Sequence, residues 1–399
     1  MRSIFHILVI PSWYPTEQNP INGIFFKEQS EALAKYGFKV SVIYAETQEG
    51  LKKITINKFK KNHFQIEIKN INNVLTYRFL GWSFPPKISR LKISFWINRM
   101  LNLADKYIQE NGKPDIIHAH CALWGGYVAY LISRKYGIPY ILTEHFTGYA
   151  RNLVKPWEKV KAKCVIQGSS FNLAVSKSFA DLLDHIFNLD KNSFGVMPNI
   201  VDIEYFNLPD CNRVTKPFIF LNVSFLTPKK GIDILIKAFN MAFKDNENVL
   251  LKIGGDGEQR QELEQLVNEL GINNKVIFLG LLDRQAVKNA MHNANALVIS
   301  SYYETFGVVA IEAMSTGLPV IATKCGGPED IITSDKLGIL INRGDINEMA
   351  NALKYMYNNY KSYNQELIRK HTIENYNDQV IVKKLEKIYN KVLLNSKKL

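Results

Sequence analysis

Short apolar runs alternate with stretches of helical periodicity along almost the whole chain. In the first half, apolar runs of strand length occur near residues 7–10, 40–44, 115–118, 140–143, 173–176 and 194–197. In the second half, similar runs occur near residues 219–224, 249–254, 276–279, 296–300, 319–322 and 338–341. Strands that alternate with helices indicate parallel sheets covered by helices on both faces. The pattern predicts an α/β protein of two Rossmann-like, doubly wound domains, with ligands at the carboxyl ends of the strands in the cleft between them.

The two sets of predicted elements are separated by residues 202–216, which lack any periodicity. This break predicts a first domain over residues 1–205 and a second over residues 206–375. The final segment, 376–399, has helical spacing but few partners nearby in the sequence. We therefore expect it to form a helix that packs back on the first domain.

Length and charge narrow the class of protein. A chain of 399 residues with 46% hydrophobic residues is too long for one ordinary core and can bury two. The 50 Lys and Arg residues outnumber the 37 Asp and Glu residues, and the formal net charge of +13 favours anionic partners. Such a partner can be a phosphorylated substrate, an acidic membrane surface or a nucleic acid. Because no nucleic-acid-binding motif occurs, we expect no nucleic-acid partner.

The spacing of the cysteines and the length of the apolar runs indicate in which cellular compartment the protein is expected. Four cysteines occur, at Cys121, Cys164, Cys211 and Cys325, without the paired spacing typical of zinc or redox motifs. The apolar run 4–10 contains His6 and meets Pro11 instead of a small-residue cleavage site, so it is read as a first buried strand. No stretch approaches 18 uninterrupted apolar residues. We expect a reduced, cytoplasmic protein.

Residues 51–110 are less regular and mix Lys and Arg with aromatic residues. Basic residues interleaved with aromatic residues suit a surface that rests on anionic lipid headgroups. A solvated basic face beside an ordinary core explains the same composition. Peripheral association with the inner face of the cytoplasmic membrane is therefore a hypothesis at this point.

Two glutamates, Glu304 and Glu312, provide the first candidate chemistry. Glu304 follows an apolar run of strand length, and Gly307 precedes a predicted helix that starts at residue 308. The backbone amides of residues 306–308 lie at that helix start, where the helix dipole favours a phosphate. Glu312, one turn into the helix, can reach back towards the same ligand. On spacing alone, a helix-entry residue and a solvated helix position remain an equal alternative.

Two further loops follow strands of the second half. Lys229 and Lys230 stand in the loop Thr-Pro-Lys-Lys-Gly, where a diphosphate can be held. The loop Gly-Gly-Asp-Gly at residues 254–257 is predicted to leave its backbone exposed. Each feature alone is weak, because a glycine turn after a strand is common and a lysine pair is usually solvated.

Together and in this order, these features carry a resemblance to a known family. The segment Pro-Asn-Ile-Val-Asp at 198–202, the Lys229-Lys230 loop, the glycine loop and the pair Glu304 and Glu312 resemble the family 4 retaining glycosyltransferases of the GT-B fold. The resemblance covers essentially the whole chain and is densest from residue 219 to 341. It implies a hexosyltransferase that moves a sugar from a nucleoside diphosphate sugar to a hydroxyl acceptor, without a metal or other cofactor.

The resemblance also implies roles for individual positions. Lys230 matches the lysine that holds the donor diphosphate, Glu312 matches the glutamate that binds the ribose hydroxyls, and Glu304 lies by the donor sugar. Lys230, Glu304 and a histidine, His120, are the residues expected to act in catalysis. The remaining donor-binding positions are expected to be Gly23, Lys229, Gly255, Gly280, Leu282, Phe306, Gly307 and Val308.

Histidines end two strands of the first half. The segment Asp-Ile-Ile-His-Ala-His at 115–120 is similar to the family's histidine strand end, which puts His120 at the reaction centre. His118 and His120 can alternatively be core histidines. His145 also ends a strand and is predicted to face the acceptor, with a role in the core as an equal alternative. Asn199 and Asp202 are predicted to organise the hinge turn, because such side chains readily cap their own backbone.

One position departs from the family. Members usually have Gly-Arg before Leu at the donor loop, and that arginine is a second clamp on the diphosphate, whereas here the residues are Ser224 and Phe225. Loss of one charged hydrogen bond costs about 1.5–3 kcal/mol of binding. Either Lys229 or Arg151 supplies the missing charge, or donor affinity is low, or transfer activity has been lost.

Several functions remain open on the sequence. The acceptor is expected to be a saccharide or a lipid-linked saccharide in surface polysaccharide biosynthesis, and a soluble acceptor is the alternative. Another GT-B activity, such as an epimerase or a phosphorylase, is the second enzymatic reading. The alternative that is not an enzyme is a non-catalytic sugar-nucleotide sensor or scaffold. The main observation in its favour is Phe225 in place of the family arginine. The sequence does not identify the sugar or the base.

Overall fold

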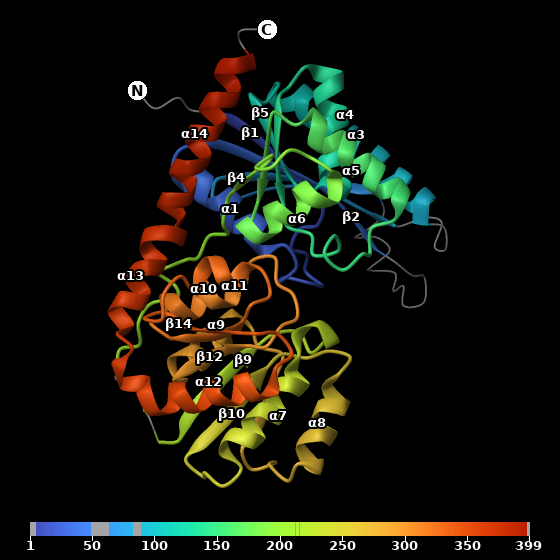
Figure 1. Ribbon diagram of the computed structural model, residues 1–399. Helices are drawn as coiled ribbons and strands as arrows, with labels where there is room; N and C mark the ends of the chain where they lie inside the picture. Colours follow the sequence, from blue (N-terminus) through green and yellow to red (C-terminus); the bar gives the residue numbers. More distant parts are fainter. Residues whose placement is uncertain (1–4, 49–63, 83–88, 212, 215, 397–399) are drawn as a thin grey trace. The chain divides into compact units, whose positions relative to one another are not determined.

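The computed structural model describes residues 5–48, 64–82, 89–211, 213–214 and 216–396, and it divides into two compact units (Figure 1). The first unit comprises Met1–Val175, Ala180–Ile200 and Asp378–Leu399, and the second comprises Ser176–Phe179 and Val201–Asn377. The predicted boundaries at 205/206 and 375/376 lie close to two of these crossings. The assignment of residues 176–179 to the second unit was not predicted.

The described residues of the first unit form an eight-stranded sheet in the order β3-β4-β2-β1-β5-β6-β7-β8. Its strands are β1 (His6–Pro11), β2 (Lys39–Gln48), β3 (Gln65–Ile71), β4 (Val74–Trp82), β5 (Ile116–His120), β6 (Tyr140–Glu144), β7 (Phe171–Ala174) and β8 (Phe194–Val196). Every neighbouring pair is parallel except β3 and β4, which are antiparallel. Central strands of this kind are buried on both faces, and every residue of β1 and β5 is buried.

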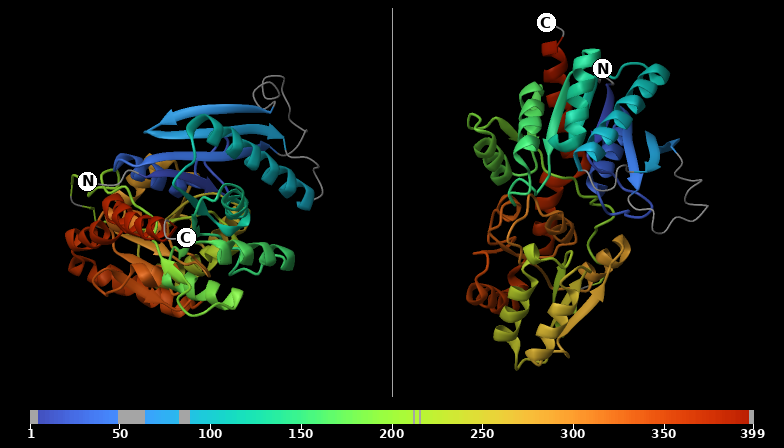
Figure 2. Two further views of the ribbon diagram at one scale, coloured as in Figure 1. Left: turned by 90° about the horizontal axis from the view of Figure 1, so that it is seen from above. Right: turned by 90° about the vertical axis from the view of Figure 1, so that its right-hand side faces the viewer.

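Helices cover both faces of this sheet (Figures 1 and 2). They are α1 (Ile24–Lys35), α3 (Ser89–Asn111), the short helix η1 (Ala122–Gly126), α4 (Tyr127–Tyr136), α5 (Pro156–Gly168), α6 (Lys177–Phe187) and α14 (Asp378–Ser396). The final helix α14 contacts α1, and its residues Ile381, Leu385 and Tyr389 belong to the same core as Val9 of β1 and Leu33 of α1. A segment from the end of the chain therefore completes the core of the first unit.

Residues 51–110, whose sequence is less regular, form regular elements in their described parts. Residues 65–82 form a β-hairpin, and residues 89–111 form a single helix, α3. Asn72 and Asn73 occupy the left-handed region at the turn, with φ of 52° and 61°, which asparagine tolerates better than most residues. Residues 49–63 and 83–88, which hold the rest of the basic and aromatic segment, lie outside the described residues.

The second unit contains a six-stranded parallel sheet in the order β11-β10-β9-β12-β13-β14. Its strands are β9 (Phe218–Val223), β10 (Val249–Gly254), β11 (Val276–Gly280), β12 (Ala296–Ile299), β13 (Val320–Thr323) and β14 (Gly338–Ile341). The order changes direction between β9 and β12. In doubly wound sheets this switch point is where ligands bind, at the carboxyl ends of the strands.

Most helices of the second unit lie between consecutive strands, and the last three come after β14. The helices are η2 (Pro228–Lys230), α7 (Ile232–Phe243), α8 (Arg260–Glu269), α9 (Arg284–His292), α10 (Val308–Ser315), α11 (Gly327–Ile331), α12 (Ile346–Asn359), η3 (Tyr360–Ser362) and α13 (Gln365–Tyr376). Buried residues of α7, α8 and α12 share a core with β9 and β10. Within the described ranges of the chain, no helix is both long and apolar enough to cross a bilayer.

Candidate active site

The loop that carries the lysine pair is fastened to the end of β12. Lys230 ends the short turn η2, and Gly231 follows in the left-handed region with φ 58°. A Cβ atom on Gly231 would lie 2.4 Å from the carbonyl oxygen of Ser300, so no side chain fits there. Ser300 Oγ donates to the carbonyl of Lys230 at 2.8 Å, and the amide of Tyr302 donates to the carbonyl of Lys229 at 2.8 Å. The two lysines are thus held beside the segment that leads to Glu304.

Glu304 itself is held by a glycine-rich loop after β13. Its amide donates to the carbonyl of Cys325 at 2.9 Å, and its carbonyl accepts from the amide of Gly327 at 2.9 Å. Gly326 has φ 121°, and a Cβ atom on it would lie 2.5 Å from the carbonyl oxygen of Glu304. Glu329 accepts from the amide of Gly326 at 2.9 Å and orders this turn. The sequence analysis missed the segment 325–329, although a glycine pair shortly after an apolar strand is a detectable signal.

Lys230 and Glu304 form an ion pair. Lys230 Nζ lies 2.5 Å from Glu304 Oε1, and Ser301 Oγ donates to the same oxygen at 2.7 Å. The two side chains are only 15% and 14% exposed. Burial alone would raise the pKa of Glu304, but the charge of Lys230 and the bonds from Lys230 and Ser301 outweigh it and lower that pKa below its ordinary value. Glu304 is therefore ionised at neutral pH.

The predicted helix start lies directly after this pair. Helix α10 begins at Val308, and Gly307 precedes it in the left-handed region with φ 101°. The first amides of any α-helix lack acceptors within the helix, so this start offers hydrogen-bond donors to an anion. Glu312 lies half-buried on α10. The side chain of Phe306 is 2% exposed and packs against Tyr376 with ring centroids 5.8 Å apart, so only its backbone is available to a ligand.

The glycine loop after β10 is only partly as predicted. Residues 256–258 are exposed, but the amide of Gly255 donates to the carbonyl of Gly280 at 2.7 Å. A Cβ atom on Gly255 would lie 1.9 Å from the carbonyl oxygen of Ser224. The prediction of an exposed backbone is therefore wrong for Gly255. Glycine is required there because the loops after β9, β10 and β11 pack closely together.

Two large apolar side chains project at the same edge of the sheet. Phe225, in the loop after β9, is 54% exposed, and Leu281, after β11, is 64% exposed. Gly280 has φ 72° and open space around its Cα atom, whereas Leu282 packs over Gly254. Of the two residues expected to replace the family arginine, Lys229 lies in this unit, where its charge contributes to lowering the pKa of Glu304. Arg151 belongs to the first unit.

In the first unit, His118 is bonded at both ring nitrogens. Its Nδ1 lies 2.7 Å from the hydroxyl of Tyr389 on α14, and its Nε2 lies 2.8 Å from Thr143 Oγ1 on β6. The residue is fully buried, and burial lowers its pKa to about 3. His118 is thus a neutral core residue, which is the alternative that the sequence analysis left open for it.

His120 and His145 lie together at the carboxyl ends of β5 and β6. His120 Nδ1 is 3.2 Å from His145 Nε2, and the rings of Phe25 and Phe26 pack against the pair. His120 is 1% exposed and His145 is 6% exposed. Burial and the other histidines hold the pKa of His120 well below its ordinary value, and burial lowers that of His145 to about 3. The structure brings the two predicted histidines together, with His145 buried against His120.

A buried carboxylate, Glu144, supports these histidines and was not predicted. Its Oε1 accepts from the amides of His145 and Phe146, both at 2.8 Å, and its Oε2 accepts from the amide of Ala122 at 2.8 Å. Burial raises the pKa of Glu144. Because these bonds tie the residues that follow β5 to those that follow β6, Glu144 positions the loop that carries His145. A lone acid at a strand end gives little sequence signal.

Gly23 lies at the entry to α1. It adopts φ 78°, and a Cβ atom on it would lie 2.9 Å from Trp13 Cδ1 and 3.0 Å from the carbonyl oxygen of Trp13. Glycine at this position lets the loop after β1 lie against the start of α1. Among the described residues, no three His, Cys, Asp or Glu side chains come together to hold a metal ion. The expectation that no metal is required stays a prediction.

Comparisons with known proteins agree on one class. The family described as Glycosyltransferase Family 4 matches residues 23–205, and that described as Glycosyl transferases group 1 matches residues 207–374. An uncharacterised glycosyltransferase of Methanocaldococcus jannaschii is 30% identical over 315 residues, which cover 77% of this chain and 79% of that protein.

Solved structures show the same fold. Sucrose-phosphate synthase from Thermosynechococcus elongatus superposes with a TM-score of 0.76 at 20% identity, over 98% of this chain and 100% of that one. HepE of Anabaena, solved in complex with UDP-glucose, gives a TM-score of 0.71 at 18% identity, over 97% and 100% of the two chains. The two parallel-sheet units thus define a glycosyltransferase of the GT-B fold. The chain belongs to the group 1 glycosyltransferases of family 4, and it is a transferase.

Proposed function

We propose that the protein is a retaining, metal-independent transferase that moves a glycosyl group from a nucleoside diphosphate sugar to a hydroxyl of a saccharide acceptor. The observation that carries this proposal is the Lys230–Glu304 pair, 2.5 Å apart and set directly before the start of α10. Few positions in a protein combine a fixed cation, a fixed anion and unpaired helix amides. A donor sugar diphosphate needs all three.

The diphosphate is the leaving group of the reaction. As the bond between the anomeric carbon and the phosphate oxygen breaks, negative charge grows on that oxygen. Lys230 and the amides at the start of α10 stabilise this charge, and fixed groups of this kind are usually the largest contribution to catalysis. Glu312, half-buried on the same helix, would hold the ribose hydroxyls. The solved complex of HepE with UDP-glucose supports a nucleotide sugar as the donor class.

Glu304 stabilises the positive charge that develops on the anomeric carbon. The anomeric carbon gains positive character when the phosphate departs, and an ionised carboxylate beside the sugar stabilises it and orients the sugar hydroxyls. Since the pKa of Glu304 is lowered, it is not a proton donor at neutral pH. In the retaining step, the acceptor oxygen bonds to the face that the phosphate leaves, and the acceptor proton passes to the departing phosphate oxygen.

His120 would act at the reaction centre as a neutral group that positions its neighbours, because its side chain is only 1% exposed. Its low pKa means that it carries no charge at neutral pH, and its contact with His145 fixes its ring. A histidine with such a low pKa is also a weak base. This property favours proton transfer to the phosphate over proton transfer to the protein.

The acceptor is proposed to be a saccharide, lipid-linked, in surface polysaccharide biosynthesis at the cytoplasmic face of a membrane. Exposed apolar residues of β3 and α3 support the membrane contact. Phe64, Ile66 and Ile68 are 44%, 38% and 47% exposed, and Leu91 and Phe95 are 46% and 51% exposed. Arg99 of α3 lies over the ring of Phe64, the residue just before β3, at 5.4 Å, so a basic side chain of the helix contacts an apolar side chain beside the strand. A surface that combines basic and apolar side chains suits anionic lipid.

The donor site is tested by thermal stabilisation with UDP, GDP and ADP, each with and without EDTA. A ligand at ~100 times its dissociation constant adds about 2.7 kcal/mol, which raises the melting temperature by several degrees. We expect a shift with one nucleotide that survives EDTA. A shift that EDTA removes would contradict metal independence. No shift with any nucleotide would contradict the donor site and favour the scaffold reading.

The stereochemistry and the membrane contact need separate measurements. NMR of the product's anomeric proton should show the configuration of the donor sugar, and an inverted product would contradict the retaining step. Sedimentation with vesicles should show more binding to anionic than to zwitterionic lipid. Phe95→Ser should reduce this binding, whereas Leu394→Ser, a similarly exposed change on α14, should not.

A further inference from the structure

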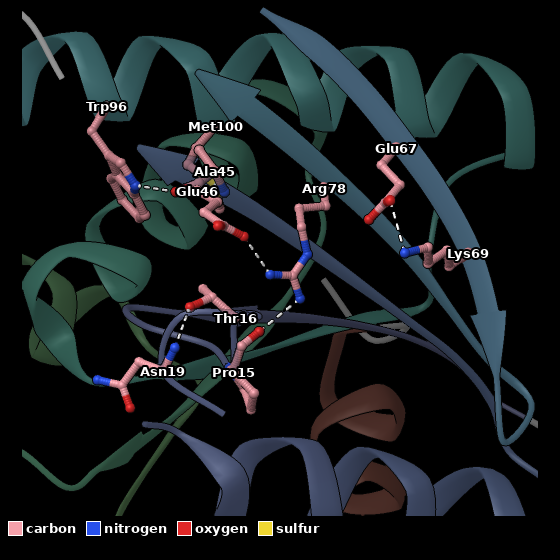
Figure 3. A network of polar contacts seen from close by, with 10 residues as sticks. All are labelled: Pro15, Thr16, Asn19, Ala45, Glu46, Glu67, Lys69, Arg78, Trp96 and Met100. Carbon is pink, nitrogen blue, oxygen red and sulfur yellow. Dashed lines mark hydrogen bonds and ion pairs between the residues drawn. The ribbon is translucent and has the colours of Figure 1, made fainter. Parts of the chain in front are cut away.

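A pocket in the first unit has no role in the chemistry described above. It has a volume of about 490 Å³ and lies between the loop after β1, helix α1 and the strands β2, β3 and β4 (Figure 3). Pockets of this size are typical of small-molecule sites. The lining residues are Tyr14, Pro15, Thr16, Glu17, Gln18, Lys27, Glu31, Glu46, Glu67, Lys69, Ile71, Val74, Thr76, Arg78 and Leu80.

The charges around this pocket are nearly balanced. Of the residues that the structure describes, four with acidic and three with basic side chains line it. They occur largely as pairs across or along its walls: Arg78 with Glu46 at 2.6 Å, Lys69 with Glu67 at 2.8 Å, and Lys27 with Glu31 at 3.7 Å. A site for phosphate or another anion would carry an excess of positive charge. A balanced set of charges instead suits a neutral ligand with many donors and acceptors.

Arg78 forms a fixed hydrogen-bonding wall of the pocket. It donates to Glu46 Oε2 at 2.6 Å and to the carbonyl of Pro15 at 2.8 Å, as Figure 3 shows. It also stacks over the rings of Tyr14 and Tyr44, 5.7 and 5.9 Å from their centroids. These contacts with described residues engage two of the five guanidinium N–H groups, so donors remain for a ligand. A planar guanidinium beside a carboxylate can bind neighbouring hydroxyls.

The pocket also has an apolar wall. Ile71 is 50% exposed although it lines the pocket, and Val74 and Leu80 continue the same wall. A pyranose ring presents C–H groups on its faces and hydroxyls around its edge. Aliphatic side chains beside fixed carboxylates and a guanidinium match both features.

The loop after β1 connects this pocket to the histidine pair. The amide of Ser12 donates to the carbonyl of His120 at 3.2 Å, and Trp13 packs against Phe26, which itself lies against His120. The next residue, Tyr14, lines the pocket. One short loop therefore has the proposed reaction centre on one side and the pocket on the other.

We infer that this pocket binds a neutral hexose unit of the saccharide acceptor, at a position away from the reacting hydroxyl. Binding of the hexose is independent of the chemistry, but its role as an acceptor subsite rests on the proposed function. The pocket then selects acceptors by the sugar that precedes the reacting one. Glu67 and Ile71 are its rim residues, and Arg78 forms its hydrogen-bonding wall.

The test uses saturation-transfer NMR on the full chain with methyl α-D-glucopyranoside, methyl α-D-mannopyranoside and methyl β-D-galactopyranoside. We expect at least one glycoside to bind. Glu67→Gln should weaken it about tenfold, because a charged hydrogen bond is lost. Ile71→Ser should weaken it several-fold, whereas Ile68→Ser should leave it unchanged. Ile68 is the matched control, since it lies on the same strand, is 47% exposed against 50% for Ile71, and does not line the pocket.

Several outcomes would overturn this inference. Binding of none of the three glycosides, or equal binding by the Ile71→Ser and Ile68→Ser variants, would exclude a hexose site here. Tighter binding of glucose 6-phosphate with steep salt dependence would show that the pocket takes anions. Failure of the proposed function is distinguishable, because stabilisation by a nucleotide depends on the second unit. A protein that binds nucleotide but shows no effect of Glu67→Gln on glycoside binding or on acceptor KM contradicts this inference alone.

Discussion

The histidine pair of the first unit and the Lys230–Glu304 pair of the second are built in opposite ways. Both follow parallel strands at their carboxyl ends. His120 and His145 are almost fully buried, and their lowered pKa values keep them neutral. Lys230 and Glu304 are partly open and charged. The same sheet architecture therefore supplies a neutral site in one unit and an ionic site in the other, which matches the neutral acceptor and the anionic donor that we propose.

The largest expected effect comes from removing the anion of the ionic site. Glu304→Gln keeps the shape of the side chain but loses the charge that stabilises the anomeric carbon. We expect kcat to fall about 100- to 1,000-fold, the range for loss of one fixed electrostatic contact, with nucleotide affinity nearly unchanged. Glu264→Gln is the control, since Glu264 lies on the surface of α8. Equal activity of Glu304→Gln and the unaltered protein would show that the charge is structural.

Removing the cation should act on binding instead. Lys230→Ala deletes the contact with the diphosphate, and we expect nucleoside diphosphate affinity to fall about 10- to 100-fold, or about 1.5–3 kcal/mol. Isothermal titration calorimetry measures this change. Lys237→Ala removes a lysine of α7 that pairs with Asp233, so it should not alter affinity. An unchanged affinity in Lys230→Ala would place the diphosphate elsewhere.

The buried, neutral histidines of the first unit, including the core residue His118, should affect the pH dependence of stability. The pKa of His118 is about 3 in the folded protein, against an ordinary value of 6.5. Between these values the unfolded chain binds a proton that the folded protein does not, so the free energy of unfolding decreases as pH falls below 6.5. Each such histidine contributes up to about 1.4 kcal/mol per pH unit.

The measurement is urea unfolding between pH 7 and pH 5. We expect His118→Gln to be less stable than the unaltered protein at pH 7 and to have a flatter pH dependence. His185→Gln, a change at an exposed histidine of α6, should retain the full slope. A slope that His118→Gln does not reduce would show that His118 is already charged in the folded protein.

The smallest expected effect concerns Phe225, which stands where members of the family usually have arginine. Phe225→Arg restores the usual charge at an exposed position, where a new ionic contact contributes about 0.2–1 kcal/mol. Nucleotide affinity should therefore rise by up to about fivefold in low salt. Leu281→Arg adds the same charge on the neighbouring loop and should help less. If Phe225→Arg instead weakens binding, the phenyl ring contributes a contact with the donor.

Most of the fold could be predicted because its central strands are buried on both faces. Strands such as β1 and β12 are continuous apolar runs, and the helices between them keep their own period. The hairpin of β3 and β4 was missed for the opposite reason. Strand β3 lies at the edge of the sheet and is exposed along most of its length, with Ile66, Ile68 and Ile71 all on the surface. Because β3 is mostly exposed, its apolar and polar residues do not follow the pattern of a buried strand, and the sequence did not predict it.

The site residues were found where the signal is local. Gly307 and the helix after it can be read from consecutive residues, as can the turn that ends at Lys230. The contact between Lys230 and Glu304 joins residues 74 positions apart and depends on how β9 and β12 pair. Two further contacts also depend on strand pairing. They are the close packing of the Glu304 carbonyl against Gly326, and the hydrogen bonds of Glu144 to the residues that follow β5 and β6. Sequence patterns predicted the parts of the site, and only the fold shows their contacts.

The bond between His118 and Tyr389 has a consequence for how the molecule is made. His118 lies on the fifth strand of the first unit, and Tyr389 lies on α14, after the whole of residues 201–377. A ribosome therefore releases the second unit before the first has its last helix. Until then, His118 lacks one of its two partners and Val9 and Leu33 lack part of their covering. The first unit begins synthesis earlier but finishes folding later.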